Sequence, residues 1–206
     1  MQRVAFDLGN VLIDLHWDGF WETIKPMFSM QERAEIKYIL EKESHIDFCG
    51  LTVLSDVLEK RYGKEVGQAV TDAWNKIVKP NNQMVNFVNK LKSEGFKVAF
   101  LSNMGFDHLN YLNKEYPDFM KLADVKHMSC EVGAAKPSLL YYQSFLMSNE
   151  DFSGCLYLDD LKDNLKMGSK VRFDSMHFDL NDYNKDKPSD LKKQLDKIHD
   201  KLLLHC

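Results

Sequence analysis

Four separate places in the chain carry side chains suited to chemistry, at strand ends or in loops. They are Asp7, Ser102, Lys136 and the pair Asp159 and Asp160. Each alone has an ordinary structural explanation, such as a turn residue, a helix cap or a solvated loop lysine. If the apolar runs before them pair as one parallel sheet, the carboxyl ends of the strands meet at one edge, where ligands bind. The sequence therefore predicts one site made from all four places.

Carboxylates brought together in such a site repel one another, so a positive charge must lie among them. Each pair about 4 Å apart costs on the order of 4 kcal/mol at an effective dielectric near 20. Oxygen ligands with room for water are typical of a Mg²⁺ site, and Lys136 would add a second, fixed positive charge. Such a site can neutralise a phosphoryl group while Asp7 lies in line with phosphorus and Ser102 and Lys136 bind the equatorial oxygens. Asp7 would then be the nucleophile, and water would hydrolyse its aspartyl-phosphate.

Apolar runs and helical stripes alternate along most of the chain, which is typical of an α/β protein. The runs predict strands over residues 4–6, 97–101, 125–128, 155–158 and 176–178. Amphipathic stretches predict helices between them, one of which ends near Gly95, and a last helix with Ser189 as its N-cap. We therefore predict a doubly wound parallel sheet with helices on both faces.

The region 16–79 has a different character, because strand-like runs give way to helical periodicity. Its apolar residues form four stripes at helical spacing, separated by proline and glycine breakers. The pattern predicts four short helices in a small bundle, inserted after the first strand into a domain formed by 1–15 and 80–206. The aromatic stripe that begins at Trp17 is more typical of bundle core than of a ligand pocket, although Trp17 is close enough to Asp7 in sequence to line one.

The bulk composition is that of an ordinary globular protein of 206 residues, with 44% hydrophobic and 28% charged side chains. A formal net charge of -4 argues against a nucleic acid partner or an anionic membrane surface. The chain shows no basic leader peptide, and no apolar run approaches the ~20 residues that cross a bilayer, so we expect a cytoplasmic protein. Its four cysteines and seven histidines lack the paired spacing of zinc or thioredoxin-type motifs. We expect a monomer or a weak dimer.

The order of these motifs resembles the haloacid dehalogenase (HAD) superfamily over essentially the whole chain. The shared order is an aspartate after the first strand, a serine after the second, a loop Lys-Pro, and a strand that ends in Asp-Asp before Asn164. Further stretches are similar to bacterial sugar-phosphate phosphatases of the glucose-1-phosphatase type: Phe6-Asp7-Leu8-Gly9-Asn10-Val11, Leu101-Ser102-Asn103 with Glu115-Tyr116-Pro117 downstream, and Gly133-Ala134-Ala135-Lys136-Pro137.

This resemblance implies a Rossmann-like core with region 16–79 as a small helical cap. It also implies a Mg²⁺-dependent phosphatase that acts on a small phosphorylated metabolite, such as a sugar phosphate, through an aspartyl-phosphate on Asp7. Asp160 would bind the metal directly, and Asp159 would lie one layer further out. The implied site residues are, for the metal, Asp7, the Gly9 carbonyl, Asp159 and Asp160, and, for the substrate phosphate, Ser102, Asn103 and Lys136.

Gly9 is a departure from most phosphatases of the superfamily, which carry a second aspartate at this position as general acid and base. Since such catalysis contributes about 10²–10⁴-fold, its absence predicts a slow enzyme or another source of the proton. Two alternatives stay open. One is a metal-independent hydrolase of carbon-halogen bonds, against which the retained Asp159 and Asp160 argue. The other is a catalytically weak module that binds a phosphorylated ligand.

Overall fold

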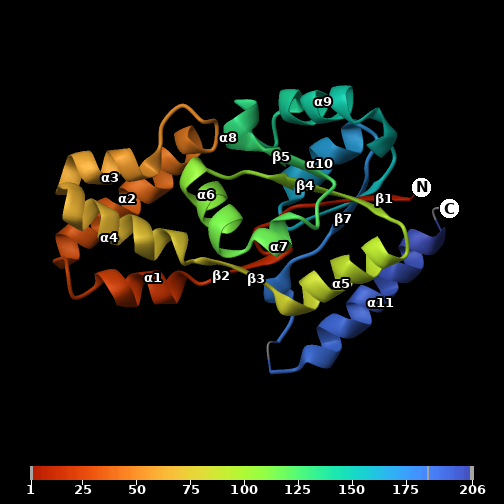
Figure 1. The fold of residues 1–206 in the computed structure, drawn as a ribbon, viewed down its shortest axis with the longest axis horizontal. Helices are drawn as coiled ribbons and strands as arrows, with labels where there is room; N and C mark the ends of the chain where they lie inside the picture. Colours follow the sequence, from red (N-terminus) through yellow and green to blue (C-terminus); the bar gives the residue numbers. More distant parts are fainter. Residues whose placement is uncertain (1, 185, 205–206) are drawn as a thin grey trace.

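The computed structural model describes residues 2–184 and 186–204, without the side chains of 43–46. Within these residues the central sheet has five parallel strands in the order β5-β4-β1-β6-β7 (Figure 1). The strands are β1 (Arg3–Phe6), β4 (Lys97–Ser102), β5 (Val125–Met128), β6 (Leu156–Asp159) and β7 (Asp174–His177). Phe6 of β1 is paired with Phe100 of β4 on one side and with Leu158 of β6 on the other. This register aligns the carboxyl ends of the three central strands.

Side chains alternate between the two faces of the sheet, so each face has its own apolar core. Phe6 belongs to the larger core, which α5 (Asn82–Ser93) and α11 (Pro188–Leu204) cover side by side. Ala5 faces the smaller core, which contains side chains of α9 (Leu139–Ser148) and α10 (Lys162–Lys170). The remaining elements of the sheet region are α6 (Phe106–Glu115), α7 (Pro117–Met120), α8 (Ser129–Val132) and the short 3-10 turns η1 (Glu150–Phe152) and η2 (Leu180–Asp182). The predicted doubly wound α/β fold is thus confirmed.

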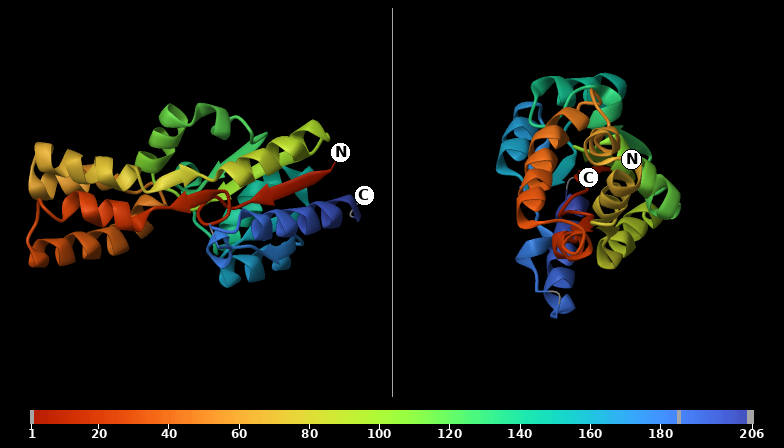
Figure 2. Two further views of the ribbon diagram at one scale, coloured as in Figure 1. Left: turned by 90° about the horizontal axis from the view of Figure 1, so that it is seen from below. Right: turned by 90° about the vertical axis from the view of Figure 1, so that its left-hand side faces the viewer.

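A helical bundle lies beyond one end of the sheet. It consists of α1 (Trp17–Ile24), α2 (Met30–Asp47), α3 (Leu54–Tyr62) and α4 (Lys64–Asn75). Figure 2 shows it extending away from the sheet, at the end opposite both termini. An antiparallel ribbon of β2 (Ile13–Leu15) and β3 (Val78–Pro80) joins the bundle to the sheet region. The sequence pattern did not predict this ribbon, because its strands are three residues long and too short to show alternation.

Several predicted details are wrong. The last strand begins at Asp174 rather than at 176, because its pairing with β6 starts there. Ser189 is not an N-cap but lies inside α11, whose first helical residue is Pro188, a position where the missing N–H of proline costs nothing. Leu51 begins the third of the four predicted helical stripes, but it is 77% exposed in the loop before α3.

Cys49, Cys130 and Cys155 are free thiols, and Cys206 lies outside the described residues.

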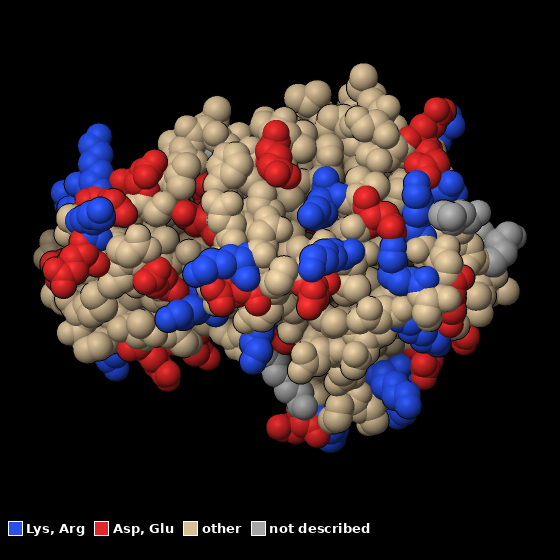
Figure 3. All heavy atoms as spheres, viewed as in Figure 1, with Lys and Arg blue, Asp and Glu red and all other residues tan. Residues whose placement is uncertain are grey.

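The surface carries charges of both signs. Figure 3 shows lysines and arginines interspersed with aspartates and glutamates over the bundle and the sheet region on this face. Among the described residues, no helix combines the length and the apolar character needed to cross a bilayer.

Candidate functional site

The predicted site residues meet at the carboxyl edge of the central strands. Asp7 directly follows β1, Ser102 is the last residue of β4, and Asp159 is the last residue of β6. One carboxylate oxygen from each of Asp7, Asp159 and Asp160 lies within 4.8 Å of the other two. Lys136, from the loop after α8, reaches the same point. The structure therefore brings together groups that the chain separates by up to about 150 residues.

Lys136 is the cation at the centre of the site. Its side chain is 1% exposed, and its Nζ lies 2.9 Å from Asp7 Oδ1 and 2.8 Å from Asp159 Oδ2. The same Nζ donates to the Leu101 carbonyl at 2.9 Å and to the Tyr157 hydroxyl at 3.3 Å. Burial by itself lowers the pKa of Lys136, but the two carboxylates outweigh this effect and raise that pKa above its ordinary value. Lys136 therefore stays charged.

The Asp159 carboxylate accepts hydrogen bonds from several donors. Besides Lys136, its carboxylate accepts from the Leu161 amide at 2.8 Å and from Asn164 Nδ2 at 3.0 and 3.1 Å. The Tyr157 hydroxyl donates to its Oδ2. With both oxygens engaged and no exposure of the residue, Asp159 is placed to orient Lys136 rather than to contact a ligand freely.

Opposing effects act on the charge of the Asp7 carboxylate. Its Oδ1 accepts from the Leu8 amide at 2.7 Å and from Lys136. Burial raises the pKa of Asp7 to about 7; Lys136 acts against this rise, and the charges of Asp159 and Asp160 add to it. The three carboxylates thus exceed the positive charge that Lys136 supplies. The remaining imbalance favours a bound cation.

Asp160 is fixed from a different direction. Its Oδ2 accepts from Asn10 Nδ2 at 3.0 Å, and its backbone carbonyl contacts His177 Nε2 at 3.0 Å. Burial raises the pKa of Asp160, the Asn10 hydrogen bond opposes this, and the charge of Asp159 adds to the rise. Asn10 reaches it from a left-handed backbone conformation, with φ of 53°, in the tight turn after Gly9. Asparagine tolerates this conformation better than most residues.

Asn103 ties the phosphate-binding candidates together. Its Nδ2 donates to the Lys136 carbonyl at 2.8 Å, and its Oδ1 accepts from the Lys136 amide at 2.7 Å. This two-way bond sets the backbone of the Lys136 loop against the end of β4. Ser102 lies at the end of β4 and is 3% exposed.

Gly9 contributes no side chain, but the space beside it is open. A Cβ built on Gly9 would meet Leu15 Cδ1 at 3.8 Å, an ordinary contact distance. Its φ lies outside the left-handed range that requires glycine. An aspartate could therefore fit here, and the absence of one is a property of the sequence rather than of the fold.

Sequence reasoning missed two supporting residues, Tyr157 and Asn10. Strand periodicity could have found Tyr157, because residues 157 and 159 of a strand point to the same face. Asn10 carried a weaker signal: an asparagine after a glycine indicates a turn, and the turn explanation hid its side-chain contact with Asp160. The carboxylate oxygens of Asp7 and Asp160 are hard donors, of the kind that suits Mg²⁺.

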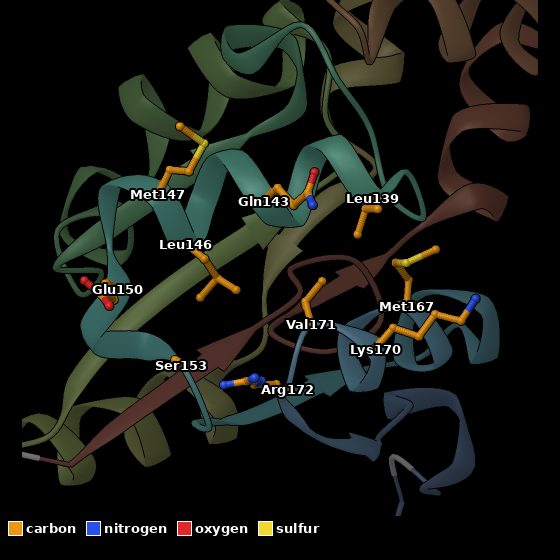
Figure 4. Close-up of a pocket in the computed structure, with 10 residues that line it drawn as sticks. All are labelled: Leu139, Gln143, Leu146, Met147, Glu150, Ser153, Met167, Lys170, Val171 and Arg172. Atoms are coloured by element: carbon orange, nitrogen blue, oxygen red, sulfur yellow. The ribbon is translucent and has the colours of Figure 1, made fainter.

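Two cavities have linings that contain none of the three site carboxylates. One, of about 910 Å³, is an open groove between α9 and α10 with Leu146 and Val171 at its centre and Arg172 at its edge (Figure 4). Its lining contains none of the predicted site residues. The other, of about 530 Å³, lies in the bundle and is lined by Trp17, Trp21, Lys37, Leu40, Glu41, Phe48 and Trp74.

Comparison with solved structures gives the fold a context. A HAD family enzyme from Bacteroides thetaiotaomicron, solved as wild-type protein in complex with magnesium and inorganic phosphate, matches with a TM-score of 0.73 and 22% identity over 86% of this chain and 93% of that one. A predicted HAD-like family hydrolase from Porphyromonas gingivalis matches with a TM-score of 0.72 and 20% identity over 94% and 98%.

A dehalogenase is also among the structural neighbours. The L-2-haloacid dehalogenase from Xanthobacter autotrophicus, solved with chloropropionic acid covalently bound, matches with a TM-score of 0.58 and 13% identity over 85% of this chain and 76% of that one. No protein-family model matches the chain. The chain therefore has the fold of HAD-family enzymes, while its likeness to the glucose-1-phosphatase type stays a prediction.

Proposed function

We propose that this protein is a Mg²⁺-dependent HAD-type hydrolase that cleaves a small phosphomonoester through an aspartyl-phosphate on Asp7. The observation that carries the proposal is the convergence of Asp7, Asp159 and Asp160 around the buried cation Lys136 at one edge of the sheet. Residues 1–15 and 80–206 would form the catalytic core, and 16–79 the cap. The structural neighbour solved with magnesium and inorganic phosphate also supports this proposal.

The site residues would divide the work as follows. The Leu8 amide and Lys136 hold Asp7 Oδ1 and so fix the plane of the carboxylate for in-line attack on phosphorus. Asp7 forms the new P–O bond while the bond from phosphorus to the leaving oxygen breaks. Lys136 and Ser102 stabilise the charge on the equatorial oxygens. Mg²⁺ held by Asp7, Asp160 and the Gly9 carbonyl would neutralise the phosphoryl charge.

The leaving oxygen needs a proton that residue 9 does not supply. Water or a group on the substrate would provide it, and water would then hydrolyse the acyl phosphate to release Asp7 and inorganic phosphate. This shortage of a carboxylic acid predicts a low kcat rather than a different reaction.

The bundle cavity offers a surface for the organic part of the substrate. All three tryptophans of the chain line it. Trp17 follows β2 almost directly, and Leu15 of that strand lies close to Gly9 in the loop after Asp7. A leaving group with an apolar face suits this lining. Tryptophan fluorescence of the variant Asp7→Asn, titrated with a panel of phosphorylated metabolites, would rank the candidates.

Metal dependence tests the proposal most directly. Phosphate release from p-nitrophenyl phosphate should be lost in EDTA and restored by Mg²⁺. Turnover that EDTA does not affect would contradict a magnesium phosphatase. A metal-independent dehalogenase is the second candidate, because a dehalogenase shares the fold; halide release from 2-chloropropionate in EDTA would favour it. Tight binding of a phosphate analogue without phosphate release would favour the non-catalytic module.

A further inference from the structure

At the contact between the helical bundle and the sheet region, each side places a carboxylate at the N-terminal end of a helix of the other. The Asp47 carboxylate, at the end of α2, lies against Gly105 at the N-terminus of α6, and the Phe106 amide there acts to lower the pKa of Asp47. In return, Asp107 of α6 accepts from the Ser55 amide at the start of α3, at 2.8 Å, and from the Ser55 hydroxyl, also at 2.8 Å. Free amides at helix N-termini favour a negative charge, so both placements suit a carboxylate.

Gly105 leaves room for the Asp47 carboxylate because it has no Cβ. A Cβ built on Gly105 would lie 1.7 Å from Asp47 Oδ2, so any other residue would expel the carboxylate. The backbone itself does not require glycine, because Gly105 has φ of -81°. Asp47 is 2% exposed, and its Oδ1 has no hydrogen-bond partner among the described residues. Burial of a carboxylate with an unpartnered oxygen costs free energy, so the contact must offset that cost.

The same bundle segment touches a second loop of the sheet region. Gly50 follows Asp47 in a turn closed by a hydrogen bond from its amide to the Asp47 carbonyl at 2.8 Å. A Cβ on Gly50 would lie 2.2 Å from the carbonyl oxygen of Cys130 in α8. The Met104 amide donates to Ser129 Oγ at 2.9 Å and so ties the two loops to each other. One loop continues from Ser102 and the other leads to Lys136.

We propose that Asp47 and Asp107 are positioning residues that form a latch, in which each carboxylate lies at a helix N-terminus across the contact, and that the latch braces the loops bearing Ser102 and Lys136. The bracing half of this inference rests on the proposed function, whereas the latch itself does not. Burial raises the pKa of Asp47 to about 7, with a further rise from the charge of Asp107, which is consistent with a carboxylate enclosed between two elements.

Amide hydrogen exchange tests the latch without reference to activity. Both Gly105→Ala and Asp47→Ala should accelerate exchange at the Ser55 amide by about tenfold, although neither residue touches Ser55. Amides in the centre of β1 and β4 should keep their protection. Gly19→Ala is the matched control, because nothing lies within 4 Å of a Cβ at that position. Unchanged exchange at Ser55, or equal acceleration throughout the sheet, would overturn the latch.

A double-mutant cycle sharpens this test. Once Asp47→Ala has removed the carboxylate, the space beside residue 105 is free, so adding Gly105→Ala should accelerate exchange no further. Effects that multiply would mean that the two residues act separately and would overturn the latch. Asp47→Asn keeps the size of the side chain and an oxygen at the N-terminus of α6, and it should retain most of the protection. This variant also decides the question if Gly105→Ala does not fold.

Steady-state kinetics tests the bracing. With p-nitrophenyl phosphate and Mg²⁺, under conditions where each variant is fully folded, Asp47→Ala and Gly105→Ala should lower kcat by about tenfold with a smaller change in KM, and Asp47→Asn should restore kcat. Full kcat in a variant with fast Ser55 exchange would overturn the bracing and leave the latch. If the unaltered protein releases no phosphate, the proposed function fails, and the exchange result still decides the latch.

Discussion

Two places in the described part of the chain bury carboxylates, and they do so in opposite ways. At the sheet edge, Asp7 and Asp159 share the cation Lys136 and a set of backbone and side-chain donors. At the contact with the bundle, the described residues place no cation beside Asp47 and no hydrogen-bond partner at its Oδ1. At the sheet edge, the buried cation keeps carboxylates charged and in position to react. At the bundle contact, the carboxylate links two parts of the chain through a helix end.

The difference shows in what each region can tolerate. Ion pairs and hydrogen bonds build the sheet-edge site, so removing a charge there leaves other charges unpaired. The bundle contact adds ring packing to its helix-end carboxylates: His108 of α6 is stacked on Trp74 of α4 with ring centroids 4.7 Å apart, and its Nε2 lies 3.0 Å from the Trp74 carbonyl. Changes there should move elements relative to one another before they unfold anything.

The variant Asp7→Asn should have the largest effect. An amide keeps an oxygen for the Leu8 amide but cannot attack phosphorus, so phosphate release should fall by more than about a thousandfold while the protein stays folded. Stopped-time phosphate assays and circular dichroism would measure the two quantities. Asp118→Asn, at a side chain that is 94% exposed, is the control. Undiminished turnover would remove Asp7 from the mechanism.

Replacing the shared cation tests whether the sheet-edge site depends on charge balance. Lys136→Met keeps much of the volume but leaves Asp7 and Asp159 buried together, which should cost about 3–5 kcal/mol in the free energy of unfolding. Urea denaturation would measure this loss. Lys114→Met, at a side chain that is 83% exposed, should change stability by less than about 0.5 kcal/mol. Equal effects of the two variants would show that the sheet-edge site does not depend on its buried cation.

The open space at residue 9 allows a gain-of-function test. If the missing acid limits turnover, Gly9→Asp should raise kcat by about tenfold or more, since the nearest atom to a new Cβ is Leu15 Cδ1 at 3.8 Å. Single-turnover kinetics would separate a faster chemical step from faster product release. An unchanged chemical step would show that another group or step sets the rate.

The smallest expected effect is that of Asp47→Asn on how the free energy of unfolding changes with pH. Burial raises the pKa of Asp47 from 3.8 to about 7, so the folded state binds this proton more tightly than the unfolded state. Its contribution to stability is present at low pH and is lost as the pH rises through about 7. Because asparagine does not titrate, the variant does not lose stability in this way. Relative to the unaltered protein, it should therefore be more stable at pH 8 than at pH 5, by about 1 kcal/mol after solvent screening.

His108 gives this measurement an internal check. Burial lowers the pKa of His108 to about 4, so its contribution favours the folded state increasingly as the pH rises from about 4 to 6.5. Because both proteins carry His108, this opposite trend cancels in the difference between them. Denaturation curves at matched pH values would give that difference, and a constant difference across the range would contradict a raised pKa at Asp47.

The sequence by itself determined the sheet, the helices of the bundle and the candidates for chemistry. Apolar runs followed by carboxylates mark strand ends, and the period of the apolar residues separates strands from helices, so Asp7, Lys136, Asp159 and Asp160 could be named without coordinates. The resemblance to the HAD superfamily rested on their order. The distance between them, the donors that saturate Asp159, and the contact of Asn10 with Asp160 could not be read from that order.

Tertiary structure alone decided how the bundle meets the sheet. Asp47, Gly105 and Asp107 carry no local signal, since an aspartate near a helix end and a glycine before a helix are common features of any chain. Their significance comes from a contact between residues about 58 positions apart, where a missing Cβ makes room for a carboxylate. Local patterns record which backbone a residue favours, whereas a contact of this kind depends on the packing of two elements whose relative position no local pattern specifies.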